Sequence, residues 1–567
     1  MGGAPPGSQV APLPRDLPFR LVSKTIGSGA YASIRKAIPL NAPKPVIAVK
    51  FINKEHAYRI GNLRPKQLQY EINIHKVVGE SGHDNIVRFL SWGDDRSWTW
   101  IAMELAEGGD LFDKIEADEG VGEDIAHFYF KQLINAVAWC HGKGVAHRDI
   151  KPENMLLTGD GDLKLADFGL ATVYLNTTTG ARKTCGMVCG SPPYIAPEII
   201  LVGTTNQKRK ASGGDKLGYA PNVADIWSCA IVLFVLLVGN TPWDVPIAKD
   251  SEEFHEFLQT EGRPQDELWD KVPLSMLSLL RGMLRVDETK RFTIDDIRIH
   301  PWFMRPNAYM SKDGKAANAV TLATSMIERL RIDFDAQVPS SQTQSQARSQ
   351  KPADPMDLDS STQPTRAAPA WTSHFAATQP TTPIADLPFE WEAPSRPGLT
   401  SISASQPTTS FDRSAALATH TLAEQLSQDP SMSQFAPTPS VPMSRTQAAR
   451  HFKDIMPSHS LTRFYSIAPL PQLLPLLVSS LHQLGIPVPA LPQQVLEAAG
   501  KEEKAQIRIK TTDGRKQGMS GTLLVERIGD GLVEVRFVKA KGDPLEWRRL
   551  FKRVVVLCKD VVVRLNE

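Results

Sequence analysis

Three polar residues in the first third of the chain have types and spacing that suit phosphoryl transfer. Asp149 follows a His-Arg pair, Asn154 comes five residues later, and Asp167 begins the tripeptide Asp-Phe-Gly. Phosphoryl transfer needs one carboxylate that meets the attacking hydroxyl, and a second carboxylate with an amide that hold Mg²⁺ over a triphosphate. We therefore assign the first role to Asp149 and the metal-binding role to Asn154 and Asp167.

Two basic residues lie in the same stretch. Lys151 comes two residues after Asp149 and is placed to neutralise the transferring phosphate, while Arg148 is placed to pair with a phosphate on the following loop if one forms. Leu163 to Ala166 alternates like a short strand, so a hairpin is expected to join the loops of Asp149 and Asp167. Either tripeptide alone recurs by accident, but both at this separation predict the catalytic loop of a protein kinase.

The segments before this loop predict a site for ATP. Gly27-Ser28-Gly29 interrupts a strand-like pattern, and the missing side chains let backbone N–H groups approach phosphate oxygens, although Ala32 replaces a third glycine. A β-branched strand then ends at Lys50, which is expected to hold the α- and β-phosphates with Glu71 as its ion-pair partner.

The adenine side of the site is expected after a buried strand at 98–104. Backbone groups of Glu104 and Ala106 are predicted to pair with the adenine edge, and Met103 to close the back of the pocket. The whole predicted nucleotide-binding set is Ile26, Gly27, Ser28, Gly29, Ile34, Ala48, Lys50, Glu71, Met103, Glu104 and Ala106. ATP and Mg²⁺ are the predicted cofactors.

Further along, Ala-Pro-Glu ending at Glu198 is typical of the close of an activation segment, and Arg291 is its expected buried partner. Asp225 is expected to accept backbone N–H bonds from the catalytic loop. The Gly- and Lys-rich stretch 204–221 is predicted to be a mobile surface insert, and the catalytic domain to end near 306.

Bulk properties limit the class of protein. The 567 residues exceed one core and suggest two to four domains, and the net charge of +2 does not favour direct nucleic-acid binding. Five cysteines without ligand spacing read as reduced thiols. No apolar leader is present at the N-terminus, and the apolar run 226–238 is too short to span a bilayer, so we expect no transmembrane segment.

Between Ser340 and Gln447 the composition shifts to Ser, Thr, Pro, Gln and Ala, which predicts disorder. This window contains 11 glutamines, and 10 of them follow Ser or Thr, although 32 Ser or Thr among 108 residues predict only about three such pairs by chance. The excess indicates an enzyme that reads Ser/Thr-Gln. The predicted phosphosites are Ser341, Thr343, Ser345, Ser349, Thr362, Thr378, Ser405, Ser427, Ser433 and Thr446.

Residues after about 448 regain a globular pattern. A helix near 470–486 is expected to pack on strands at 506–511, 520–527 and 532–539. An amphipathic helix at 543–556 carries four basic residues on its polar face. That face is either simply solvated, or it docks on an acidic surface, acts as a nuclear-import signal, or binds an anionic membrane.

Taken with these motifs, residues 19–306 resemble the protein Ser/Thr kinases throughout, and Lys151 matches the Ser/Thr-specific members. The pieces GGDLFDKIEAD, ADFGLATVY, LTRFYSIAP and KGDPLEWRRLFKRVV are similar to the checkpoint kinase 1 family. The resemblance implies an α+β fold with a bilobal kinase domain at 17–306, after a disordered stretch at 1–16. A disordered linker at 307–447 and a small α+β kinase-associated domain 1 at 448–567 would follow.

The resemblance also implies a role in the DNA-damage and replication checkpoint that delays mitotic entry. Its expected substrates are the phosphatases and kinases that control mitosis, and phosphatidylinositol-3-kinase-like damage kinases are expected upstream. Adaptor or phosphopeptide-binding proteins are further expected partners, with localisation in the nucleus and also the cytoplasm. Glu107, Asp110 and Glu153 are expected to bind an arginine at substrate position −3, and the tail to restrain the catalytic domain.

Two other functions fit parts of the sequence. A pseudokinase scaffold would use only its phosphorylated linker, but such proteins usually lack the lysine or aspartates that are present here. A cortical, membrane-associated kinase would use the tail to bind phospholipid. The excess of Ser/Thr-Gln pairs favours the damage-response function over both.

Overall fold

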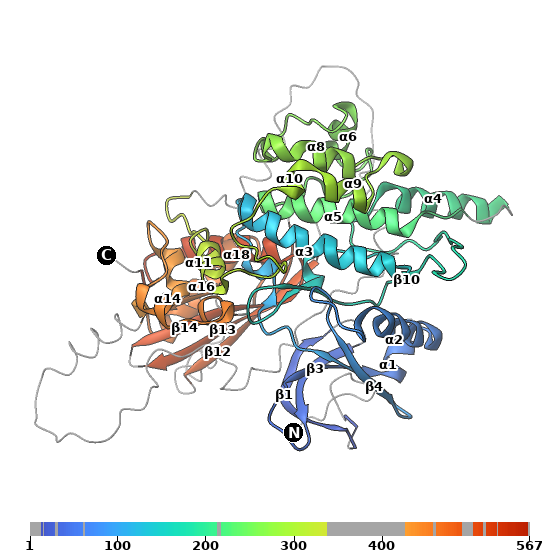
Figure 1. Ribbon diagram of the computed structural model, residues 1–567. Helices are drawn as coiled ribbons and strands as arrows, with labels where there is room; N and C mark the ends of the chain where they lie inside the picture. The colour runs from blue at the N-terminus through green and yellow to red at the C-terminus, as the bar shows by residue number, and fades with distance from the viewer. Residues whose placement is uncertain are drawn as a thin grey trace, which may run out of the picture.

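The computed structural model shows an N-lobe, a C-lobe and a C-terminal α+β unit that lies beside the C-lobe (Figure 1). It describes residues 13–14, 16–28, 32–59, 63–212, 217–336, 426–457, 461–489, 503–513, 518–529 and 531–564. All structural statements below refer to these residues.

The N-lobe is an antiparallel sheet in the order β1-β2-β3-β5-β4, with two helices. Its elements are β1 (Phe19–Ser28), β2 (Ala32–Pro39), β3 (Ile47–Asn53), α1 (Lys54–Arg59), α2 (Pro65–Gly79), β4 (Phe89–Asp94) and β5 (Trp98–Glu104). Alternating side chains give the sheet two apolar faces. Leu68 and Ile72 of α2 cover one face, and Phe19, Phe51 and Trp98 cluster on the other.

The C-lobe is built on α3 (Glu123–Gly142) and α5 (Pro221–Val238), which pack against each other. α5 is long and apolar enough to cross a membrane by length and composition, but 89% of it is buried inside the protein, as befits a core helix. The other C-lobe helices are α4 (Pro197–Ser212), α6 (Glu252–Gln259), α7 (Glu267–Asp270), α8 (Leu274–Met283), η3 (Glu288–Lys290), α9 (Ile294–Ile299) and α10 (Pro301–Met304).

Short strands between the lobes carry the loops of the candidate site. β6, β8 and β9 form one small sheet, and β7 pairs with β10 in another. Their bounds are β6 (Gly109–Asp110), η1 (Phe112–Lys114), β7 (Val145–Ala146), η2 (Pro152–Asn154), β8 (Met155–Leu157), β9 (Leu163–Leu165) and β10 (Thr172–Val173). The predicted hairpin between the two aspartate loops is therefore present as β8–β9.

The predicted mobile surface insert at 204–221 contains regular and buried structure that the sequence did not lead us to expect. Residues up to Ser212 continue α4, because Gln, Lys, Arg and Ala in this part favour helix. At the other end Tyr219 is 1% exposed, and its backbone pairs with Cys185. Residues 213–216 lie outside the described part of the chain.

The predicted disordered linker at 307–447 is wrong at both of its ends. α11 (Ala319–Ile327) buries Leu322, Ala323, Met326 and Ile327 in the C-lobe core, since these residues form one apolar helical face. At the other end, η5 (Pro430–Phe435) and α14 (Met443–Ala448) are ordered elements, followed by α15 (Phe452–Ile455). Within the predicted linker, residues 337–425 lie outside the described part of the chain.

The C-terminal unit, here called the tail domain, comprises the described residues from 461 to 564. Its sheet has the order β11-β14-β13-β12, and the edge strand β11 is one that the sequence pattern did not reveal. The elements are β11 (Arg463–Ser466), α16 (Leu470–Gln483), β12 (Lys504–Thr512), β13 (Gly518–Gly529), β14 (Leu532–Lys541) and α18 (Pro544–Leu557). The apolar side of α18 packs on this sheet and on α16.

Candidate active site

The catalytic loop between β7 and β8 is held by one buried carboxylate. Asp225 of α5 accepts hydrogen bonds from the backbone N–H groups of His147 and Arg148, both at 2.8 Å. His141 is its third neighbour, at 2.9 Å. This is the contact that the sequence predicted for Asp225. It stabilises a sharp turn in which Arg148 has φ of 65°.

Asp149 lies in a network of groups from the catalytic loop and the activation segment. Lys151 Nζ is 3.0 Å from one carboxylate oxygen, and the Ser191 hydroxyl donates to the other at 3.3 Å. The amide nitrogen of Asn154 donates to the Asp149 backbone carbonyl at 2.8 Å. Lys151 is fully buried, which by itself lowers its pKa, but the carboxylates of Asp149 and Glu153 outweigh burial and raise that pKa. Lys151 is therefore a cation at neutral pH.

Ser191 is a member of this network that the sequence analysis did not single out. Its hydroxyl accepts a hydrogen bond from Lys151 Nζ at 2.9 Å as well as donating to Asp149. The residue belongs to the Gly-Ser-Pro-Pro segment before the end of the activation segment. That neighbourhood was its only sequence signal.

The predicted ion pair between β3 and α2 is present. Lys50 Nζ lies 2.6 Å from Glu71 Oε1 and 3.4 Å from Asp167 Oδ1. Burial by itself raises the pKa of Asp167, but the positive charges of Lys50 and Lys151 outweigh burial, so this pKa lies below its ordinary value. Asp167 therefore stays ionised at neutral pH, as a metal ligand must.

Phe168, next to Asp167 in the chain, packs between two histidine rings. It stacks on His75 of α2 with ring centroids 5.2 Å apart, and the His147 ring lies 5.2 Å from the same phenyl ring. His75 Nε2 is hydrogen-bonded to the Val87 carbonyl at 2.9 Å. Burial lowers the pKa of His75 to about 4, so its imidazole is neutral at physiological pH. These ring contacts tie α2, and hence Glu71, to the loop of Asp167.

Asn154 and Asp167 suit the binding of a divalent cation. The amide nitrogen of Asn154 points at Asp149, so its amide oxygen is the atom that can bind a metal. The backbone links the two candidate ligands, since Ala166 N donates to the Asn154 carbonyl at 2.9 Å. Oxygen ligands of this kind, one anionic and one neutral, fit a hard divalent cation.

Strand register places the remaining nucleotide-binding candidates near Lys50. Ile34 pairs with Gly27 across β1–β2 and with Lys50 across β2–β3, and Ala48 pairs with Met103 across β3–β5. Ile26 and Ser28 lie on β1, whereas Gly29 lies outside the described residues. In the connector after β5, the amide of Glu104 already donates to the Arg88 carbonyl at 3.0 Å, and the Ala106 carbonyl accepts from Gly109 at 3.3 Å.

Arg148 faces inward in this structure. Its Nε donates to the Leu170 carbonyl at 2.7 Å, it is hydrogen-bonded to the Tyr219 side chain, and the residue is 8% exposed. The segment end is fixed separately: Arg291 donates to both oxygens of Glu198, at 2.6 and 2.9 Å, which is the predicted pairing. These contacts anchor the activation segment at both places.

Acidic side chains gather beside the catalytic loop, and we call Glu107, Asp110, Asp113 and Glu153 the acidic cluster. Burial, followed by the charge of Asp113, raises the pKa of Asp110 well above its usual value, and burial also raises the pKa of Glu153. Asp113 was not among the predicted residues, although it follows Asp110 by only three positions. The cluster is next to the catalytic machinery, because Asp110 pairs with Leu156 of β8.

The acidic cluster faces two lysines from the C-terminal part of the chain. Lys453 of α15 forms an ion pair with Glu107. Lys539 of β14 lies 3.6 Å from Asp113 and near Asp110 and Glu153. We call these two residues the tail lysines.

Of the predicted phosphosites, three lie in the described part of the chain. Ser433 is 3% exposed within η5, whereas Ser427 and Thr446 are half-buried. The other seven lie outside the described residues: Ser341, Thr343, Ser345, Ser349, Thr362, Thr378 and Ser405.

Comparison with known proteins agrees with this geometry. The protein kinase domain model matches residues 21–303. The chain is 34% identical to the serine/threonine-protein kinase chk1 of Schizosaccharomyces pombe over 541 aligned residues. This alignment covers 94% of this chain and 95% of the relative. It is 32% identical to CHK1 of Saccharomyces cerevisiae over 98% of this chain and 99% of the relative, and 30% identical to CHK1 of Mycosarcoma maydis over 97% and 98%.

Proposed function

The chain belongs to the checkpoint kinase 1 family of serine/threonine-protein kinases, and on that premise we propose how it transfers phosphate, chooses substrates and is restrained. As a protein kinase it uses ATP and a divalent metal, which we propose is Mg²⁺. Asp149 accepts the proton of the substrate hydroxyl, while Lys151 stabilises charge on the transferring group. Lys50 positions the phosphates, and Asn154 and Asp167 hold the cation.

One observation carries this mechanism. Lys50 contacts both Glu71 and Asp167, at 2.6 and 3.4 Å, so the three groups that must align for phosphate binding already form one chain of contacts. Transfer depends mostly on such positioning and on electrostatic stabilisation. A pseudokinase scaffold has no need of this arrangement.

We further propose that the enzyme prefers arginine at position −3 of its substrate. The acidic cluster supplies several carboxylates next to the catalytic loop, and a guanidinium can bind two carboxylate oxygens at once. Burial raises the pKa of Asp110 and of Glu153, and the charge of Asp113 adds to the shift at Asp110, so a bound cation would favour the ionised carboxylates.

Two matched peptides test the mechanism and the preference together. Full-length protein with Mg²⁺ and ATP is expected to phosphorylate a serine peptide with Arg at −3 at least 10-fold more efficiently, in kcat/KM, than the same peptide with Ala at −3. Addition of a chelator should abolish turnover, and excess Mg²⁺ should restore it. Equal efficiency on both peptides would remove the proposed preference while leaving the kinase activity itself intact.

The tail domain is proposed to restrain the catalytic domain through α18. Arg548 Nη2 lies 2.9 Å from Glu116 Oε2, and Lys552 Nζ lies 2.7 Å from the other oxygen of Glu116. The Glu116 side chain is completely buried in this structure. Arg549 binds both oxygens of Asp118, at 2.6 and 2.9 Å. Loss of one partner of a buried pair such as Arg548 and Glu116 typically costs about 3–5 kcal/mol, so this contact is well suited to hold a closed state.

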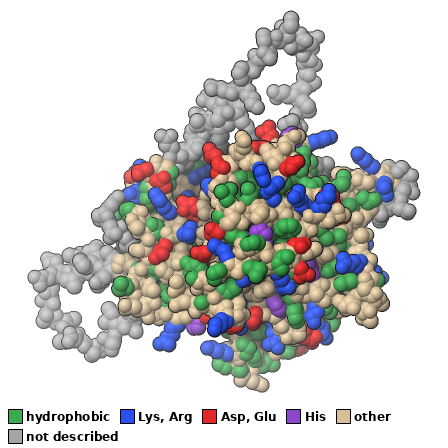
Figure 2. Space-filling view, turned by 45° about the horizontal axis from the view of Figure 1, so that its top comes forward, with side chains coloured by type: hydrophobic (Ala, Val, Ile, Leu, Met, Phe, Trp, Pro, Cys, Tyr) green, Lys and Arg blue, Asp and Glu red, His purple; other side chains and the backbone are tan. Residues whose placement is uncertain are grey.

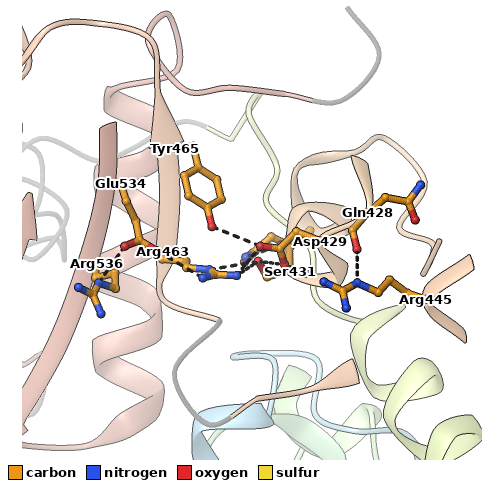
Figure 3. Close-up of polar contacts among 9 residues, drawn as sticks. Gln428, Asp429, Ser431, Arg445, Arg463, Tyr465, Glu534 and Arg536 are labelled. Atoms are coloured by element: carbon orange, nitrogen blue, oxygen red, sulfur yellow. Dashed lines mark hydrogen bonds and ion pairs between the residues drawn. The ribbon is translucent and has the colours of Figure 1, made fainter. Parts of the chain in front are cut away.

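The end of the linker is part of the same closed arrangement (Figure 3). Asp429 pairs with Arg463 of β11 and accepts a hydrogen bond from Tyr465 at 3.3 Å. Glu534 of β14 pairs with Arg463 from the other side at 3.3 Å. Farther along, Gln434 accepts from Arg548 at 2.7 Å, which joins the linker end to the residue that binds Glu116.

Phosphorylation of Ser/Thr-Gln sites is proposed to weaken this closed state. Ser433 is buried immediately before Gln434, and a phosphate there would place about two negative charges where there is no room for them. We propose phosphatidylinositol-3-kinase-like damage kinases as the enzymes that add these phosphates. Adaptor or phosphopeptide-binding proteins would then bind the phosphorylated linker.

For the cell, we propose that the enzyme acts in the DNA-damage and replication checkpoint and delays mitotic entry. Its substrates would be the phosphatases and kinases that control mitosis, and it would work in the nucleus and also in the cytoplasm. The face shown in Figure 2 carries interspersed acidic and basic side chains, a surface suited to protein partners rather than to nucleic acid.

A membrane-binding tail is the other candidate for the basic helix α18. In this structure Arg548, Arg549 and Lys552 of that helix are engaged with Glu116 and Asp118, which favours an intramolecular role. Sedimentation of the full-length protein with anionic liposomes tests the alternative. Binding that is lost in Arg549→Asp, with no change in kinase activity, would favour the membrane.

The restraint itself is tested with two substitutions on the same helix. Arg549→Asp reverses a charge that binds Asp118 and should raise basal activity by about 10-fold, since a charge-assisted hydrogen bond contributes about 1.5–3 kcal/mol. Arg553→Asp makes the same change at an exposed position and should leave activity unchanged. If Arg549→Asp also leaves activity unchanged, α18 does not restrain the catalytic domain.

A further inference from the structure

The catalytic centre is assembled while the tail domain is docked. Lys50, Glu71 and Asp167 are in mutual contact, and Asp149 retains its contacts with Lys151 and Asn154. These contacts join groups of the kinase domain to one another. The docked tail thus leaves the catalytic groups aligned, so its restraint falls on another step.

The tail lysines instead meet the carboxylates that are proposed to read the substrate. Lys453 pairs with Glu107, and Lys539 lies 3.6 Å from Asp113 with Asp110 and Glu153 as its next acidic neighbours. Only 19% of the Lys539 side chain is exposed. All four members of the acidic cluster thus face a lysine that comes from more than 300 residues further along the chain.

Each lysine is held in place by its own element. On the α15 side, Lys453 N donates to the Gly159 carbonyl at 3.2 Å, and His451 lies 2.6 Å from Asp160. Phe452 packs so closely on Gly161 that an added Cβ would come within 2.6 Å of its ring. These contacts seat α15 on the turn of the β8–β9 hairpin, next to the catalytic loop.

Lys539 reaches the cluster from β14 of the tail domain, and α18 packs against η1, which contains Asp113. Burial by itself lowers the pKa of Lys539, but the charges of Asp113, Asp110, Glu153 and Asp543 outweigh it and raise that pKa. The side chain is therefore an ammonium group in an acidic environment, which is the chemistry of a bound basic substrate residue.

We propose that Lys453 and Lys539 occupy the subsites for basic substrate residues, so that the docked tail competes with basic peptides and not with ATP. This inference rests on the proposed preference for arginine at −3, and it specifies which step the tail blocks. Such competition makes the inhibition selective, because the KM of a peptide that does not use the acidic cluster changes little when the lysines are removed.

Steady-state kinetics of the full-length protein test the proposal. The variants are Lys453→Ala/Lys539→Ala, the conservative Lys453→Arg/Lys539→Arg, and the control Lys510→Ala, which changes an exposed lysine of β12. The two peptides differ only in Arg or Ala at −3. The double alanine variant should lower KM for the Arg peptide by about 10-fold and change KM for the Ala peptide and for ATP by less than about twofold. The arginine variant and Lys510→Ala should behave like wild type.

The outcomes separate this proposal from the proposed function. If wild type prefers the Arg peptide but removal of the lysines does not change the KM for that peptide, the lysines do not occupy the subsites, and the substrate preference stands. If KM falls equally for both peptides, the lysines only hold the tail in place, and the proposed occupation of the subsites is again wrong. If no variant distinguishes the peptides, both proposals fail. Thermal denaturation of each variant checks folding, and the arginine variant gives a readout even where alanine perturbs the docked tail.

Discussion

The catalytic centre and the acidic cluster lie side by side, yet their charges are satisfied in different ways. In the catalytic centre the partners come from within the kinase domain, as in the buried pair of Lys50 and Glu71 at 2.6 Å. In the acidic cluster the cationic partners are Lys453 and Lys539, from α15 and the tail domain. The first set is fixed whenever the kinase domain is folded, whereas the second depends on docking.

This difference separates the alignment of the catalytic groups from the access of substrate to its subsites. A kinase whose catalytic groups are already aligned needs no rearrangement of its active site to become active, only removal of what covers the substrate subsites. The exposures agree, since Glu107 and Asp113 are each more than 40% exposed while Glu71 is 6% exposed. Contacts near solvent can exchange for a substrate, and buried ones cannot.

The largest expected effect comes from the catalytic centre. Asp149→Asn removes the proton acceptor and should lower kcat by about 10³-fold, because general base catalysis commonly contributes 10²–10⁴-fold. KM for the Arg peptide should change little, since the acidic cluster is untouched. Peptide phosphorylation at saturating ATP measures both constants. Retention of more than a tenth of wild-type kcat would contradict the assigned role.

Acid should lower the free energy of unfolding of the protein through His75, which lies beside the catalytic centre. The unfolded chain binds a proton on this residue near pH 6.5, but the folded chain does not until about pH 4. Stability is therefore lost as pH falls from 6.5 to 4, by about 3 kcal/mol from this group.

The check is the thermal midpoint of wild type and His75→Asn at pH 7.5 and pH 5. The asparagine cannot take up the proton, so the variant should lose less of its midpoint over this interval. Parallel losses in the two proteins would show that His75 is not the group responsible.

Because Ser433 is buried, undocking of the tail should raise the rate of its phosphorylation about tenfold. In wild type a Ser/Thr-Gln-directed kinase should phosphorylate Ser433 slowly, because the residue is 3% exposed while the tail is docked. Arg549→Asp should raise that rate by about 10-fold, and the rate at the half-buried Thr446 by less. Site-resolved mass spectrometry over a time course measures both rates. Equal rates in wild type and variant would mean that Ser433 is reached without undocking.

The smallest effect is a salt dependence confined to the acidic cluster. Ion pairs near solvent are screened as ionic strength rises, whereas buried pairs are screened much less. The ratio of kcat/KM between Lys453→Ala/Lys539→Ala and wild type, measured with the Arg peptide, should fall several-fold towards one between about 0.05 and 0.5 M salt. A constant ratio would argue against an electrostatic contact.

Much of the catalytic centre could be predicted from the sequence because phosphate and metal geometry restrict it. The spacings that place Asp149, Asn154 and Asp167 are short, and Lys50 needs one acidic partner on the helix that follows it. Even the long-range partners of Glu198 and Asp225 were predictable, since a buried charge demands a specific counterpart. The β8–β9 hairpin followed from the alternating residue pattern, whereas the α+β class was implied by the resemblance to a known family.

Other features were missed, although some of them had a local signal. α11 lies before the composition shift at Ser340 and its apolar face spans only nine residues, while the edge strand β11 has only four. The continuation of α4 to Ser212 was not predicted, because the glycines on either side of this stretch indicated a loop. Asp113 and Ser191 acquire roles only through neighbours that the fold supplies.

By itself the sequence determined the chemistry, because a few residue types at short, rigid spacings are needed to hold a nucleotide, a cation and a hydroxyl. Only the tertiary structure decided which lysines meet Glu107 and Asp113 and that Ser433 is buried. Any of the chain's many lysines could pair with an exposed carboxylate as far as sequence is concerned. The choice is made by the apolar and buried ionic contacts that dock α15 and α18 on the C-lobe, and these join segments too far apart for spacing to relate them.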